Sequence, residues 1–242
     1  MILLLFGFSA VYFFVYILAA VIPAILLMIY VYRKDRIEQE PVRLVGMLML
    51  YGALSGFIAM ALEALGEKLL PVFVSPDNPY YMVFFAFLVV AAAEEGVKFF
   101  FLKRKTWNDP NLDHQFDGIV YAAAVSMGFA AMENIGYVFS YGISVAPIRA
   151  FLSIPGHMAF AVAMGVLYGR ARLWENRQDH RKAVAFQAAA YLAAVFLHGF
   201  YDACAMMGTD LSAIFFIIFV VVTYIGIFFI IKRESRTDRP LE

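Results

Sequence analysis

The sequence contains few charged residues and almost no cysteine. Only 16% of its 242 residues are charged, whereas 63% are hydrophobic, and the mean hydropathy is +0.76. A water-soluble fold would have difficulty burying so much apolar surface, so this composition indicates a polytopic membrane protein. The single cysteine, Cys204, excludes an internal disulfide and a metal site built from several cysteines, and we expect it to pack as a small apolar residue.

Other features are absent as well. No Lys or Arg precedes Arg33, so the apolar segment at 1–32 lacks the basic start of a signal peptide, and we expect it to be retained as a membrane span. No polar loop is long enough to form a soluble domain. The formal net charge of zero gives no indication of nucleic-acid binding, and we predict none. Any activity is therefore expected within the bilayer.

Seven apolar segments are long enough to cross a hydrocarbon core of about 30 Å at about 1.5 Å per helical residue. We predict an all-α bundle of seven transmembrane helices forming a single membrane domain, at about residues 8–32, 42–62, 80–102, 117–141, 147–169, 183–206 and 211–231. The longest loop, 63–79, contains the helix-breaking sequence VSPDNP. In the second span, Gly52 and Gly56 have the spacing that lets two helix backbones approach closely.

Basic residues are distributed unevenly between the two sides of this arrangement. Sixteen of the 19 Lys and Arg residues lie in four polar segments, at 33–43, 103–116, 170–182 and 232–242. With seven spans, these four segments face the same side of the membrane. The positive-inside rule then predicts a cytoplasmic C-terminus and an N-terminus outside the cell.

The third span is interrupted by ionisable residues in the stretch AAAEEGVKFFF at 91–101. A charge at the centre of a membrane helix costs about 2.5–3.5 kcal/mol, so Glu94, Glu95 and Lys98 need partners or a function. Glu94 and Lys98 are four residues apart, in the order that favours an intrahelical ion pair, and Lys98 can also reach Glu95. An ion pair that only served helix packing would need one glutamate, so the second carboxylate favours chemistry.

Further polar residues lie on the fourth and fifth spans. Glu133 and Asn134 lie among small residues that would let neighbouring helices approach, and an interhelical hydrogen bond would by itself explain Asn134. His157 follows Pro155, which frees a backbone carbonyl and can bend the helix towards a cavity. An acidic side chain such as Glu133 is harder to explain by helix packing alone.

On the sixth span, His198 and Asp202 are four residues apart, so one helix face presents an imidazole and a carboxylate together. Depths counted along the predicted spans place the polar residues near the middle of the membrane, with the glutamate pair somewhat deeper than its partners. We therefore expect an active-site core within residues 91–202.

Motifs on successive spans resemble those of the PrsW family of intramembrane proteases, which belongs to the wider group containing the type II CAAX prenyl endopeptidases. The matching stretches are DRIEQEP at 35–41, EEGVK at 94–98, FDGIVYA at 116–122, GFAAMENIGY at 128–137, PGHMAF at 155–160 and HGFYD at 198–202. The wider group has an FxxxH motif, but here Phe129 is followed at the fourth place by Glu133. Lys98 also stands one residue before the arginine of the CAAX enzymes, so the resemblance favours PrsW.

The resemblance implies peptide-bond hydrolysis in or beside the membrane. The activity of the family is the first cut of a membrane-anchored anti-sigma factor on its extracytoplasmic side. The expected partners are therefore a single-span membrane protein as substrate and the membrane lipid, and the expected location is the cell membrane.

Hydrolysis of a peptide bond needs a group that activates water, a proton carrier and groups that stabilise an oxyanion. Glu94 or Glu95 is the candidate base, and His198, oriented by Asp202, is the candidate proton carrier. His157 and Asn134 are the candidate oxyanion stabilisers. Glu133 is a further candidate catalytic carboxylate, and Lys98 is the charge partner of the second glutamate.

The sequence leaves the question of a metal open. Glu133, His157, His198 and Asp202 could together bind zinc, because zinc accepts imidazole and carboxylate ligands. The sequence has no HExxH motif, and Lys98 can neutralise the glutamates without a cation. We favour a site without a metal, with zinc as the alternative.

Two other classes of function are compatible with buried ionisable groups. A proton- or cation-coupled transporter would use the same carboxylates and histidines as a relay. Seven spans do not divide into equal halves, and the segment with the glutamates is not repeated elsewhere in the sequence. A noncatalytic membrane scaffold would leave the buried charges unexplained.

Overall fold

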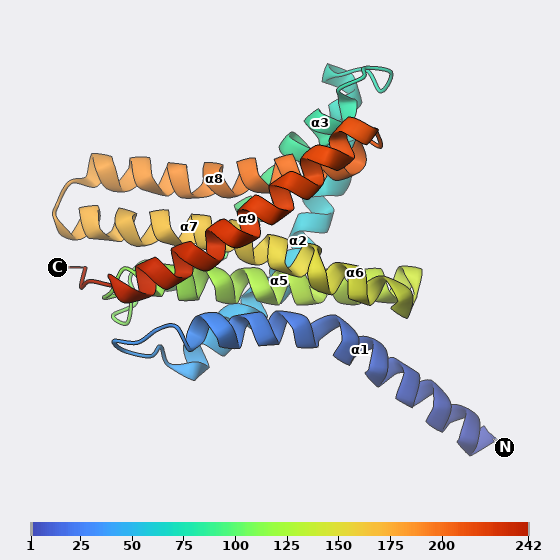
Figure 1. The fold of residues 1–242 in the computed structure, drawn as a ribbon, viewed down its shortest axis with the longest axis horizontal. Helices are drawn as coiled ribbons and strands as arrows, with labels where there is room; N and C mark the ends of the chain where they lie inside the picture. Colours follow the sequence, from blue (N-terminus) through green and yellow to red (C-terminus); the bar gives the residue numbers. More distant parts are fainter. Residues whose placement is uncertain (1, 242) are drawn as a thin grey trace.

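Helices form wherever the sequence predicts a membrane span. The computed structural model describes residues 2–241 of the chain, with side chains from residue 11 onwards. Its elements are α1 (Ile2–Tyr32), α2 (Val42–Phe73), α3 (Tyr81–Phe84), the π-helix η1 (Phe85–Ala91), α4 (Ala92–Thr106), α5 (Asp117–Tyr141), the 3₁₀-helix η2 (Ile143–Val145), α6 (Ala146–Phe151), α7 (Ser153–Asn176), α8 (His180–Met206) and α9 (Asp210–Arg236) (Figure 1).

The described residues contain six helical segments that are long and apolar enough to cross a membrane: within α1, in α2, in α5, from η2 to the end of α7, in α8 and in α9. The predicted third span is also helical, as α3, η1 and α4, although Glu94, Glu95 and Lys98 make it more polar than the others. The chain is therefore an all-α, multi-pass membrane protein.

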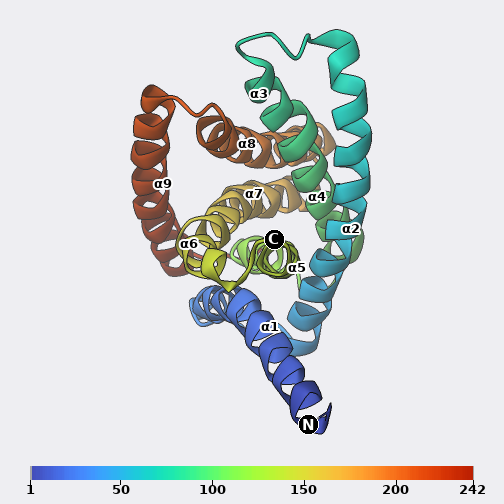
Figure 2. The same cartoon turned by 90° about the vertical axis from the view of Figure 1, so that its right-hand side faces the viewer.

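Helix α5 forms the centre of the bundle. In its most apolar stretch 83% of the residues are buried, against 6% in α9, whose large apolar side chains face outwards. Helix α5 packs against α1, α2, α4 and α7, and Figure 2 shows these helices around it. Its sequence explains this position, because seven of the ten residues at 122–131 are Ala, Gly or Ser, which leave room for neighbouring helices.

Helices α2 and α5 touch backbone to backbone. A Cβ atom added to Gly52 would lie 1.9 Å from the carbonyl oxygen of Val125, and one added to Gly128 would lie 1.9 Å from that of Met49. At Gly56, the nearest atom to an added Cβ would be a side-chain atom of Met132 at 3.8 Å, an ordinary contact. The predicted close approach is therefore confirmed at Gly52 and wrong at Gly56.

The loop predicted at 63–79 is mostly helix. Helix α2 continues eleven residues beyond the predicted end at 62, through the segment EALGEKLLPVF, and ends at Phe73 just before VSPDNP. The prediction ended the span just before Glu63, where the sequence becomes more polar. In the structure, the extra turns of α2 place Glu63 on the wall of a cavity instead of in a loop.

The predicted fifth span is divided into two helices. Helix α6 ends at Phe151, and α7 begins at Ser153, with Leu152 between them. Pro155 lies in the first turn of α7, where the missing N–H of a proline costs no helical hydrogen bond. The predicted bend is thus a break. The carbonyl of Leu152 accepts hydrogen bonds from the N–H of Gly156, at 3.1 Å, and from the hydroxyl of Tyr224 on α9.

The four basic segments gather at one end of the bundle, on the left of Figure 1, together with the C-terminus. Hydrogen bonds join them there: Ser235 donates to the carbonyl of Lys34, and the N–H of Gln115 donates to that of Arg239. The opposite end is formed by the α2–α3 connection, the end of α5 with α6, and the turn between α8 and α9 (Figure 1). The loops thus alternate between the two ends of the bundle along the chain, and which end faces the cytoplasm stays a prediction.

Candidate active site

Lys98 binds both glutamates of helix α4. Its Nζ atom donates to Glu94 Oε2 at 3.1 Å and to Glu95 Oε1 at 2.8 Å, and all three residues are at most 5% exposed. The spacing of three and four residues places these side chains on neighbouring faces of one helix, as the sequence predicts. The π-helix η1 ends immediately before this segment, a position that π-helical turns often take at functional sites.

His198 on α8 lies between two carboxylates. Its Nδ1 atom is 2.8 Å from Glu95 Oε1 and 3.9 Å from Glu94 Oε2, and its Nε2 atom is 3.3 Å from Asp202 Oδ2. The ring of Phe160 stacks on the imidazole with a centroid separation of 4.8 Å. The glutamates are therefore not too deep to reach His198, because the α3–α4 segment crosses α8 obliquely (Figure 1).

A second group of charges surrounds His157 on α7. The Nε2 atom of His157 is 2.8 Å from Glu133 Oε2, and Arg149 Nη2 lies 2.9 Å from the same oxygen. On its other side, His157 Nδ1 is 3.2 Å from Lys98 Nζ. Because an ammonium group can only donate, Nδ1 accepts this bond, and we assign the ring proton to Nε2, which donates to Glu133. Lys98 and His157 thus connect the two charge groups.

Asn134 forms the interhelical hydrogen bond that would by itself explain it in the sequence. It is fully buried, its amide Nδ2 donates to the carbonyl of Ala20 on α1 at 2.8 Å, and its Oδ1 accepts from Arg149 Nε at 2.8 Å. Both ends of the amide are occupied by these bonds. The geometry gives Asn134 a role in holding Arg149 and argues against the predicted role in oxyanion stabilisation.

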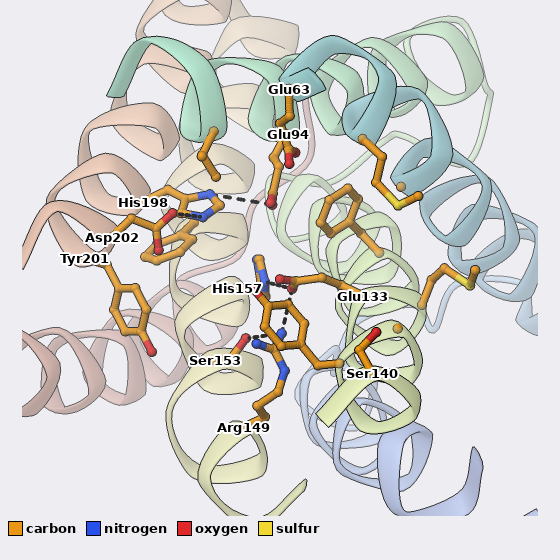
Figure 3. A pocket seen from close by; sticks show the side chains of 18 of the residues that line it. Glu63, Glu94, Glu133, Ser140, Arg149, Ser153, His157, His198, Tyr201 and Asp202 are labelled. Carbon is orange, nitrogen blue, oxygen red and sulfur yellow. Dashed lines mark hydrogen bonds and ion pairs between the residues drawn. The ribbon is translucent and has the colours of Figure 1, made fainter. Parts of the chain in front are cut away.

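A cavity of about 600 Å³ lies between α2, α4, α5, α7 and α8. Figure 3 shows Glu94, Glu133, His157, His198 and Asp202 directed into it from four of these helices. Glu95, Lys98 and Asn134 do not line the cavity, so the two neighbouring glutamates differ in their access to a substrate.

The cavity is also lined by polar residues that the sequence does not identify as site residues, among them Glu63, Arg149, Ser153 and Tyr201 (Figure 3). Arg149 has a recognisable signal, because it is one of only two basic residues predicted on the outer side of the membrane. Glu63 has no such signal, since the sequence assigns it to a loop. Ser153 accepts a hydrogen bond from Arg149 at 2.9 Å and helps to fix the guanidinium group.

The site contains more negative than positive charge. The cavity and the ion cluster hold the carboxylates of Glu63, Glu94, Glu95, Glu133 and Asp202, against the permanent cations of Lys98 and Arg149. Unpaired charges of this kind are costly inside a membrane. Protons on His198 or on the carboxylates, or a divalent metal ion, would reduce the difference.

The donor set is suitable for a metal. One ligand atom from each of Glu94, Glu95, His157 and His198 lies within 4.8 Å of the others, and all four residues are buried. Zinc binds imidazole nitrogen and carboxylate oxygen at about 2.0–2.2 Å. This set differs from the predicted one, which contains Glu133 and Asp202 in place of the two glutamates. The ammonium of Lys98 contacts atoms of three of the four residues, so it stands where a metal would bind.

Comparison with known proteins identifies related sequences. Residues 40–230 match the family model described as PrsW family intramembrane metalloprotease. Proteins named Protease PrsW from Geobacillus kaustophilus, Bacillus subtilis and Clostridioides difficile are 36%, 33% and 30% identical to this chain. The alignments cover 76%, 78% and 86% of this chain and 76%, 82% and 86% of those relatives. No solved structure matches the chain.

Proposed function

Because this chain belongs to the PrsW family of intramembrane proteases, we propose that the cavity between α2, α4, α5, α7 and α8 hydrolyses a peptide bond of a membrane-anchored protein. The observation that carries this proposal is the asymmetry of the two glutamates. Glu94 lines the cavity, whereas its neighbour Glu95 is held by Lys98 and His198 outside it.

In this mechanism Glu94 is the general base. A water molecule in the cavity gives a proton to the carboxylate of Glu94 while its oxygen attacks the carbonyl carbon of the scissile bond. Proton transfer of this kind contributes typically about 10²–10⁴ to the rate. Lys98 binds Glu94 at the oxygen Oε2 and so fixes the orientation of the carboxylate.

His198 delivers the proton to the leaving amine when the carbon–nitrogen bond breaks. Its Nε2 atom faces Asp202, and both residues line the cavity, so the proton is available at the substrate. Glu95 and Asp202 orient the ring from opposite sides, and the stacked ring of Phe160 holds its plane. After the amine leaves, the proton on Glu94 returns through His198 and restores the resting site.

The oxyanion of the tetrahedral intermediate needs donors that face the cavity. Arg149 and Tyr201 both line it, and Arg149 is held in place by Glu133, Asn134 and Ser153. His157 also lines the cavity, but each of its nitrogens already has a partner. We therefore assign oxyanion stabilisation to Arg149 and Tyr201, and assign to His157 the linking of Lys98 to Glu133.

The family description names a metalloprotease, whereas the sequence pattern favours a site without a metal. When bound, a metal held by Glu94, Glu95, His157 and His198 would polarise the carbonyl and lower the pKa of a water molecule. Lys98 competes for this position. Elemental analysis of the purified protein, with activity measured before and after chelation, tests the two alternatives; stoichiometric zinc whose removal stops cleavage would establish the metal.

The substrate we propose is a single-span protein, in particular an anti-sigma factor, cut on its extracytoplasmic side. In support, the cavity is lined by the ends of α5 and α8 and by the start of α7, all at the end of the bundle opposite the basic segments. By the positive-inside rule the basic end is cytoplasmic, the C-terminus lies inside and the N-terminus lies outside. No separate recognition domain is needed if selection depends on the substrate's span.

Reconstitution tests this function against a proton-coupled transporter. Liposomes containing the protein and a single-span substrate are compared for wild type, Glu94→Gln, Glu95→Gln and His198→Ala. We expect cleavage by the wild type and its loss in the variants. Equal cleavage by all four proteins would overturn the mechanism, and proton flux without cleavage in wild-type liposomes would favour the transporter.

A further inference from the structure

A second cluster of buried carboxylates lies at the basic end of the bundle, far from the candidate active site. Asp35 lies in the α1–α2 loop, Glu40 lies two residues before α2, and Asp117 is the first residue of α5. Asp117 and Glu133 are 16 residues apart on α5, or about 24 Å along the helix. The cluster residues come from DRIEQEP and FDGIVYA, two stretches that the proposed peptidase mechanism does not use.

The three carboxyl groups converge on one point. One oxygen from each of Asp35, Glu40 and Asp117 lies within 4.8 Å of the other two. The residues are only 2%, 4% and 1% exposed, so water screens their charges poorly. Like charges this close repel one another unless something positive lies between them.

The surrounding residues satisfy two of the three groups. Asp117 Oδ2 accepts hydrogen bonds from two backbone N–H groups of the preceding loop, at 3.0 and 2.6 Å, and Glu40 accepts one from the hydroxyl of Tyr121. Both carboxylate oxygens of Asp35 are buried without any hydrogen-bond partner. The N–H of Glu40 is near enough to lower the pKa of Asp35 but does not reach hydrogen-bonding geometry.

The side chains that the structure describes leave the cluster without a neutralising Lys or Arg. Within residues 11–241, none of the three carboxylates forms an ion pair with Lys or Arg. The nearby titratable groups of the adjoining segments are His114, before α5, and three further acids, Glu38, Asp113 and Asp238, which add negative charge. Burial raises the pKa of Asp35 to about 6 and that of Glu40 to about 7, which reflects how poorly this site tolerates unpaired charge.

We propose that Asp35, Glu40 and Asp117 bind a hard divalent cation, Ca²⁺ or Mg²⁺, that ties the α1–α2 loop to the start of α5. Carboxylate oxygens are the preferred ligands of both ions. Oxygens that bind one calcium ion at about 2.3–2.6 Å can be no more than about 4.6–5.2 Å apart, and the three oxygens here lie within 4.8 Å of one another. The free oxygens of Asp35 supply the ligands that the protein itself leaves unused. This cation site does not depend on the proposed peptidase activity.

Binding is tested on the full-length protein in detergent after treatment with EDTA. CaCl₂ and MgCl₂ are titrated separately by calorimetry, and the unfolding temperature is followed by intrinsic fluorescence. Asp35→Asn is the test variant, because it keeps the shape of the side chain and loses its charge. Asp77→Asn is the matched control, because Asp77 is exposed in the loop between α2 and α3.

We expect one equivalent of one of the two cations to bind wild type and Asp77→Asn and to raise their unfolding temperature by several degrees. Asp35→Asn should bind at least about tenfold more weakly. Without a cation, Asp35→Asn should be at least as stable as wild type, because it removes a buried unpaired charge. Wild type should therefore be the more stable protein with the cation, and Asp35→Asn should be at least as stable without it. A variant that merely damaged the fold would be less stable under both conditions.

Two results would overturn the proposal. If neither cation binds or stabilises the wild type, the cluster holds protons and not a metal. If Asp35→Asn binds the cation as tightly as the wild type, the bound cation lies elsewhere in the protein, for example at the glutamates of α4.

Discussion

Glu94→Gln should abolish cleavage while leaving the bundle folded. In the structure Lys98 Nζ lies 2.8 Å from Glu95 and 3.1 Å from Glu94, so the ammonium keeps its closer carboxylate after the substitution. A glutamine can still accept the bond from Lys98, and we expect a loss of about 1–2 kcal/mol in the free energy of unfolding. Loss of the general base should lower the rate by about 10²–10⁴, or about 3–5 kcal/mol in activation free energy.

The matched variant is Glu95→Gln. Glu95 Oε1 is bonded to both Lys98 and His198, and the residue is 1% exposed. Breaking a buried ion pair of this kind typically costs about 3–5 kcal/mol, so this variant should lose stability as well as activity. The two variants therefore differ in unfolding temperature, although both lose activity.

The assay is the initial rate of cleavage of a single-span substrate in liposomes at saturating substrate, with thermal unfolding measured on the same preparations. A rate for Glu94→Gln within about tenfold of the wild-type rate would refute the role of Glu94 as base. Equal destabilisation by the two glutamine variants would refute the division of roles between the neighbouring glutamates.

Three other predictions follow from the same contacts. Gly52→Ala should destabilise the protein by more than about 3 kcal/mol in chemical denaturation, because its Cβ would overlap the backbone of α5, whereas Gly56→Ala should cost less than about 1 kcal/mol. Lys98→Met should bind zinc more tightly than the wild type in calorimetry, because the ammonium no longer competes for the donors, and equal affinities would argue against competition. Arg149→Met should lower kcat by about 10²–10³ with little change in KM, and a change confined to KM would argue against a role in the transition state.

Much of the fold can be predicted from hydropathy. The bounds of α5 at 117–141 agree with the prediction, and helices cover all seven expected spans. The predicted end of a span is wrong where a charged residue continues the helix and its side chain faces a cavity. Glu63 is the example: hydropathy ends α2 at 62, but the helix continues to Phe73 and Glu63 faces the cavity.

The candidate site can be predicted in part. Helical spacing predicts the contacts of Lys98 with both glutamates and of His198 with Asp202, since these depend on one helix alone. Contacts between helices depend on tilt and on breaks that spacing does not contain. The bond of Asn134 to α1, the clamp of Arg149 on Glu133 and the break at Leu152 are therefore visible only in the structure.

The most direct test of the central claim is cleavage in water enriched in ¹⁸O. A single-span substrate is incubated with the wild-type protein in liposomes, and its fragments are analysed by mass spectrometry. Hydrolysis by the proposed mechanism predicts two complementary fragments, with one ¹⁸O atom in the new C-terminal carboxylate. When Glu94→Gln replaces the wild type, we expect no labelled fragments. An intact substrate in wild-type liposomes that conduct protons would contradict the account.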